Sequence, residues 1–113
     1  MSNYNLASVI EMAGGDEEFV KVVVQTFLEE IPPDLQAMNE ALREGNPSLS
    51  YQYAHKMKPN FQMFGLDLMP QIKTIEEWAK SSKPKAEVEA AAAVITNKVK
   101  VALEELKHDF DLE

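Results

Sequence analysis

The sequence predicts an all-α protein, an up-down antiparallel four-helix bundle with one or two short additional helices. Apolar residues recur at spacings of three and four, and the alternation typical of strands is nearly absent. Glycine and proline interrupt this pattern at short intervals, and short loops between amphipathic helices favour antiparallel neighbours. The 113 residues are 45% hydrophobic, enough for one domain over 1–113 with its own core.

The first half of the chain predicts three helices. A short one covers about residues 6–13, and Gly14–Gly15 ends it. Asp16 is placed to cap the second helix, where two glutamates in the first turn complement the helix dipole. Pro32–Pro33 is expected to break this helix, because proline removes a backbone donor, and a third helix then runs to about Gly45.

The second half predicts three more helices. One begins at Asn46 and ends at Gly65, and Asp67 is placed to cap the next, which runs to about Lys80. The last, from about Pro84 to Phe110, would span roughly 40 Å at 1.5 Å per residue. Acidic pairs on these helices, such as Glu76 and Glu77, are interpreted as solvated surface.

Composition excludes several classes of function. The formal charge of −8 opposes binding to nucleic acid or anionic lipid. There is no apolar run long enough to cross a bilayer, no basic-then-apolar secretion signal and no cysteine. A soluble, cytoplasmic monomer is therefore the expectation. Neither a Gly-rich phosphate loop nor a catalytic triad is evident.

His55 lies in the middle of a polar stripe on its helix. Residues three, four and seven positions apart share one helix face. The residues sharing the face of His55 are Ser48, Tyr51, Gln52, Lys58, Pro59 and Gln62. The opposite face carries the apolar Met57 and Phe61, so we expect the imidazole to stand in solvent and not in the core.

The neighbours of His55 suit chemistry with a phosphoryl group. A neutral imidazole can attack phosphorus, and the ammonium of Lys58, one turn on, disfavours the protonated ring. The same ammonium attracts phosphoryl oxygens. Lys56 would add diffuse positive potential. Gln62 could bond the imidazole or the phosphoryl oxygens, with an idle surface amide as the alternative.

These residues give the chain a family resemblance. His55, Met57, Lys58 and Gly65 match the pattern of histidine-containing phosphotransfer (HPt) domains, in which a second glycine follows the histidine by ten positions. The glycine pair and acidic residues before Phe19 also resemble the start of such domains. The resemblance covers about residues 4–108.

The resemblance implies a phosphorelay intermediate without kinase activity of its own. His55 would be the phosphoacceptor, through Nε2, and Lys58 its electrostatic support. The implied partners are response-regulator receiver domains and hybrid sensor kinases. No cofactor is implied, with Mg²⁺ expected only on the receiver. The surface expected to contact the partner comprises Ser48, Tyr51, Gln52, Lys56, Pro59 and Gln62.

Pro59 departs from the family pattern, which has glycine four residues after the histidine. Proline adds a ring to the His55 face and removes the donor for the carbonyl of His55, which should kink or loosen the helix. A degenerate adaptor that binds receivers without phosphotransfer is therefore the alternative. A di-iron site is disfavoured, because Glu105 and His108 form the one glutamate-histidine pair with the required spacing.

Overall fold

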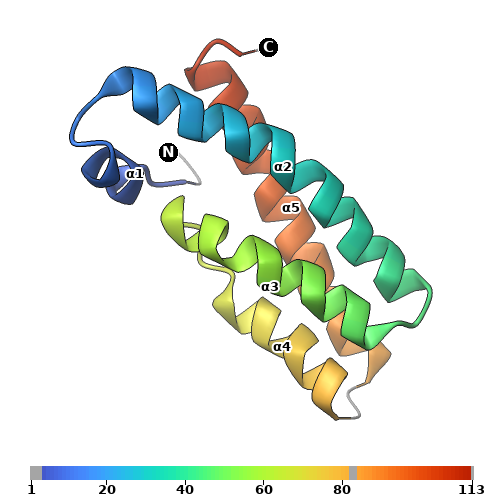
Figure 1. Ribbon diagram of the computed structural model, residues 1–113. Helices are drawn as coiled ribbons and strands as arrows, with labels where there is room; N and C mark the ends of the chain where they lie inside the picture. The colour runs from blue at the N-terminus through green and yellow to red at the C-terminus, as the bar shows by residue number, and fades with distance from the viewer. Residues whose placement is uncertain (1–3, 82–83, 113) are drawn as a thin grey trace.

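A computed structural model describes residues 4–81 and 84–112, and within these ranges the chain is helical with no strand (Figure 1). The all-α prediction is confirmed. The five helices are α1 (Ala7–Met12), α2 (Glu17–Arg43), α3 (Pro47–Met63), α4 (Met69–Lys80) and α5 (Lys85–Asp109).

The four longer helices pack side by side in chain order. α3 lies against α2 and α4, α5 lies against α4, and α5 also contacts α2, which closes the bundle. Successive helices run in opposite directions, as the colours of Figure 1 show. The short α1 packs on α2 at one end of the bundle.

Side-chain caps fix the starts of α2 and α3. Asp16 Oδ1 accepts a hydrogen bond from the backbone N–H of Glu18 at 3.0 Å, and Asn46 Oδ1 accepts one from Leu49 at 3.1 Å. The predicted cap at Asp67 is wrong. α4 begins one residue later than that cap requires, after the buried Leu68, and Pro70 lies in its first turn.

The predicted break at Pro32–Pro33 is also wrong, because α2 continues through both prolines. The missing donors leave the carbonyls of Leu28 and Glu29 without their helical partners, but both prolines and Glu29 lie on the exposed side, where water can bind these oxygens. Ile31 and Leu35 are buried on the other side. Their packing against the core keeps α2 helical across the two prolines, although proline by itself favours a break.

The buried side of α3 anchors it in the bundle. Ala54 and Met57 are fully buried and Phe61 nearly so. The Ser50 hydroxyl donates to the carbonyl of Met38 on α2 at 3.2 Å. These contacts set which side of α3 faces solvent.

Gly65 follows the end of α3, at the point where Asn5 packs against it. Its φ of +70° is a left-handed conformation that favours glycine, and a Cβ there would lie 2.6 Å from Asn5 Cβ. Asn5 also donates its N–H to the carbonyl of Phe64 at 2.8 Å. The glycine thus allows the segment before α1 to pack on the end of α3.

Replacing Gly65 by alanine should destabilise the protein more than the same change at Gly45. Both glycines have positive φ, but a Cβ at Gly45 meets open space. We expect Gly45→Ala to lose about 1 kcal/mol of unfolding free energy from backbone strain. We expect Gly65→Ala to lose about 2–4 kcal/mol, because the contact with Asn5 adds to the strain. Urea unfolding followed by circular dichroism measures both, and equal losses would contradict the close packing at Gly65.

Candidate functional site

His55 is exposed at the middle of α3, between residues that are fully buried. Ala54 precedes it and Met57 follows two residues later, and both have no exposed surface. The imidazole therefore projects from the bundle on the side of α3 opposite its core contacts. It is open to an incoming group without any movement of a helix.

The other residues predicted for this face lie around it with different exposure. Tyr51 and Lys58 are partly buried. The residues of this face that are exposed are Ser48, Gln52, Lys56, Pro59 and Gln62. α3 continues without interruption through Pro59, so the proline does not divide the face.

Lys58 belongs to α3 and lies beside α4. It lines a shallow hollow of about 440 Å³, whose other lining residues are Met69, Pro70, Ile72, Lys73 and Glu76. Within the described ranges, no carboxylate oxygen lies within 4.0 Å of its ammonium in an ion pair. Its positive charge nevertheless acts on Glu76 through space, where it contributes to lowering the pKa of that carboxyl.

Lys56 forms an ion pair with α2. Its Nζ lies 3.1 Å from Asp34 Oδ1 on α2, in an ion pair whose lysine side chain is 66% exposed and whose aspartate is 12% exposed. The partner carboxylate offsets the diffuse positive potential predicted for Lys56. The pair instead joins α3 to α2, although exposed pairs of this kind contribute only about 0–1 kcal/mol.

Gln62 does not bond the imidazole. Its Nε2 lies 3.7 Å from Met69 Sδ at the start of α4. The group found beside the ring is Tyr51, one turn before His55 on α3. Its hydroxyl oxygen lies 3.5 Å from His55 Nδ1, and the two ring centroids are 5.6 Å apart with the planes tilted by 44°.

The Tyr51 hydroxyl also reaches α4. It donates to Glu76 Oε2 at 3.0 Å, while Lys80 Nζ lies 2.9 Å from Glu76 Oε1. Glu76 thus binds a hydroxyl on one side and an ammonium on the other. Glu76 is therefore more than the solvated surface residue expected from the sequence. The spacing of Glu76 and Lys80 indicates an ion pair, but the contact with Tyr51 depends on how α3 and α4 face each other.

This network shifts the pKa of each member in a consistent direction. The hydrogen bond from Lys80, followed by the one from Tyr51, lowers the pKa of Glu76 below 4.5. The hydrogen bond to Glu76 raises the pKa of Tyr51 above 10.0 and that of Lys80 above 10.5. At neutral pH Glu76 is therefore a carboxylate, and Tyr51 keeps its proton.

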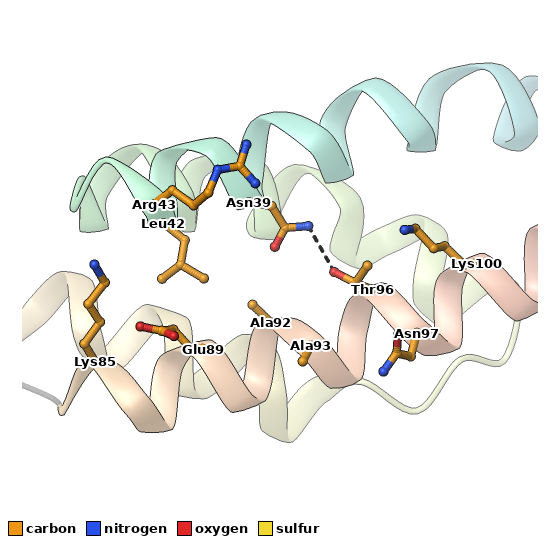
Figure 2. Close-up of a pocket in the computed structure, with 10 residues that line it drawn as sticks. All are labelled: Asn39, Leu42, Arg43, Lys85, Glu89, Ala92, Ala93, Thr96, Asn97 and Lys100. Atoms are coloured by element: carbon orange, nitrogen blue, oxygen red, sulfur yellow. Dashed lines mark hydrogen bonds between the residues drawn. The ribbon is translucent and has the colours of Figure 1, made fainter.

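Another hollow lies between α2 and α5 and has a volume of about 720 Å³ (Figure 2). Asn39 donates to Thr96 Oγ1 across it at 3.0 Å. Arg43, Lys85 and Lys100 line it together with Glu89, and no residue of α3 takes part. It therefore shares no residue with the His55 face.

The described residues contain neither a membrane-spanning helix nor a metal-binding cluster. None of their helices is long and apolar enough to span a bilayer. Over residues 4–81 and 84–112, no group of three or more histidine, aspartate or glutamate side chains could hold a metal ion.

The fold and the site define a helical module that presents a histidine to solvent from the middle of one helix. The family model for the Hpt domain matches residues 22–109, so the chain belongs to the Hpt domain family. Domains of this family interact with receiver domains and kinases in phosphorelays and need no cofactor of their own. Membership supports a phosphotransfer-related role in two-component signalling. Searches of curated proteins and of solved structures gave no significant match.

The ion pair of Glu76 should affect stability in acid. Since folding lowers the pKa of Glu76, its contribution is present above about pH 4.5 and is lost as pH falls through the lower folded value. Between about pH 5 and pH 3, we expect the melting temperature of wild type to fall more than that of Glu76→Gln. Thermal melts at several pH values measure this. Glu29→Gln, an exposed change on α2, is the control, and parallel curves for wild type and Glu76→Gln would contradict the assignment.

Proposed function

We propose that this protein is a phosphorelay intermediate, in which His55 accepts a phosphoryl group from an aspartate of one receiver domain and passes it to an aspartate of another. The observation that carries the proposal is the exposed imidazole between two buried residues of α3, inside the range that matches the Hpt domain. Such a ring is fixed by the core and yet accessible to a second protein.

For this reaction the chain needs to supply only a correctly positioned nucleophile and a nearby cation. In the forward step, His55 Nε2 forms a bond to phosphorus, the P–O bond of the aspartyl phosphate breaks, and the receiver regains its carboxylate. The second step reverses this on another receiver. Phosphoryl transfer is catalysed mainly by positioning and by stabilising charge on the equatorial oxygens. Lys58 would supply that charge on this chain, and Mg²⁺ is expected on the receiver.

The exposed part of the His55 face is the proposed docking surface for receivers and hybrid sensor kinases. Ser48 and Gln52 lie before the histidine along α3, and Pro59 and Gln62 lie after it. We expect the carrier to act as a cytoplasmic monomer, with residues 1–113 as one domain.

An adaptor that binds receivers without transfer is the second candidate, and Pro59 is the feature that favours it. Its ring occupies the exposed face where the family pattern has glycine. The uninterrupted α3 weighs against this candidate, because Lys58 and Pro59 continue the same helix as His55. Transfer is therefore the preferred function.

A phosphorylated receiver should label this protein on His55. Wild type is incubated with each phosphorylated receiver of the same organism, and acid-labile, base-stable phosphate is measured on the protein. We expect labelling of wild type, none of His55→Gln, and full labelling of His108→Gln, which removes the other exposed histidine. No labelling by the whole set of receivers, together with measurable binding to one of them, would support the adaptor.

Lys58 and Lys56 should differ in the same assay. Lys58→Gln is expected to slow transfer about tenfold, less than the 10²–10³ lost with a buried oxyanion donor, because Lys58 is partly solvated. Lys56→Gln should transfer at nearly the wild-type rate, since its ammonium is paired with Asp34. Lys58→Arg should keep most of the rate. Equal rates for the two glutamine variants would remove the proposed role of Lys58.

A further inference from the structure

Three residues from two helices form a hydrogen-bonded chain that ends on the imidazole. It runs from Lys80 Nζ through the two oxygens of Glu76 to the Tyr51 hydroxyl and then to His55 Nδ1, over distances of 2.9, 3.0 and 3.5 Å. The last contact is at the long end of the hydrogen-bond range. Catalytic hydrogen bonds are often long before the reacting group binds.

The direction of this chain follows from which groups can donate. A carboxylate only accepts hydrogen bonds, and a tyrosine has a single proton to give. Because the pKa of Glu76 is lowered and that of Tyr51 is raised, the tyrosine proton is donated to Glu76 at neutral pH. The hydroxyl oxygen then faces His55 Nδ1 as an acceptor, and this contact requires a proton on Nδ1.

We propose that Tyr51 and Glu76 are positioning residues that hold neutral His55 in the tautomer with its proton on Nδ1 and its lone pair on Nε2. The hydrogen bond made by one ring nitrogen sets the chemistry of the other. Neutral histidine in water prefers the opposite tautomer, with the proton on Nε2. The consequence for transfer rates rests on the proposed phosphorelay function, whereas the tautomer itself does not.

The same chain has a second effect during transfer. As Nε2 forms its bond to phosphorus, the ring gains positive charge while Nδ1 keeps its proton. The Tyr51 oxygen accepts that proton in a hydrogen bond, and the negative Glu76 lies one hydroxyl further on. Their dipole and charge favour the product-like ring. Lys80 holds Glu76 in place from its other oxygen.

The tautomer can be measured directly on the folded protein. In ¹⁵N-labelled protein, long-range ¹H–¹⁵N correlation spectra distinguish a protonated ring nitrogen from one carrying a lone pair. At a pH where the ring is neutral, wild type is expected to carry its proton on Nδ1. Tyr51→Phe should shift the population towards Nε2–H. Tyr53→Phe, which removes a hydroxyl from another side of α3, should match wild type.

Glu76→Ala provides a second route to the same readout. Without the carboxylate, the Tyr51 hydroxyl is free to donate to Nδ1, which selects the Nε2–H tautomer. We expect a shift at least as large as that of Tyr51→Phe. A wild-type ring with its proton on Nε2, or populations unchanged in both variants, would overturn the proposal.

A small phosphoryl donor tests the reactivity without any receiver. With phosphoramidate, the histidine nitrogen bonds to phosphorus, the P–N bond breaks and ammonia leaves. ³¹P NMR then identifies which ring nitrogen carries the phosphate. Wild type should react at Nε2. Tyr51→Phe should react about fivefold more slowly there, because the rate follows the fraction of the competent tautomer, and should also yield Nδ1 product.

The two proposals fail separately. A wild-type ring in the stated tautomer that no receiver phosphorylates would support the positioning role and overturn the phosphorelay. A protein that receivers phosphorylate with an unchanged tautomer in Tyr51→Phe and Glu76→Ala would do the reverse.

Discussion

Burial of one stripe of α3 is the constraint on which the rest of the site depends. Ala54, Met57 and Phe61 are at most 1% exposed, and truncating a buried methionine or phenylalanine to alanine usually costs about 2–5 kcal/mol. Turning α3 far enough to bury His55 would expose these side chains. The core therefore holds the imidazole in solvent, and no polar contact is needed to keep it there.

Positively charged residues gather near His55, although the chain as a whole is negatively charged. The protein carries a formal charge of −8, yet the groups nearest the His55 face include three lysines on α3 and α4. Lys56 and Lys80 are paired with carboxylates, whereas Lys58 lines the hollow beside α4. In the proposed phosphorelay, a receiver would thus meet a local cation on this face, and the ring is linked to the carboxylate of Glu76 through a tyrosine hydroxyl.

Much of the fold could be predicted, because long stretches of helical periodicity and local capping residues mark the helices in the sequence. The helix predicted from about Pro84 to Phe110 is found as Lys85–Asp109, the helix predicted to begin at Asn46 is found as Pro47–Met63, and the predicted cap at Asp16 forms. Pro32–Pro33 misled the prediction, because tertiary packing on the opposite side of α2 outweighs two missing backbone bonds.

The exposed position of His55 also followed from the helical period, but its partners did not. Tyr51 was placed on the correct face, yet its bond to Glu76 joins residues 25 positions apart, and the pair of Asp34 with Lys56 joins residues 22 apart. Such contacts depend on the rotation of each helix about its axis and on its distance from its neighbour. A single sequence contains the period of each helix and not these relative angles.

The pair of Lys56 with Asp34 has a consequence for the charge beside the imidazole. Asp34 follows Pro32–Pro33 on α2, and its partner is the residue directly after the histidine. One residue step turns a helix by 100°, so the exposed Lys56 lies beside the ring on the helix surface. Because the buried stripe already fixes the rotation of α3 and such an exposed pair contributes only about 0–1 kcal/mol, losing Asp34 should leave the imidazole in place and change the electrostatics beside it, since the Lys56 ammonium would lose its carboxylate partner.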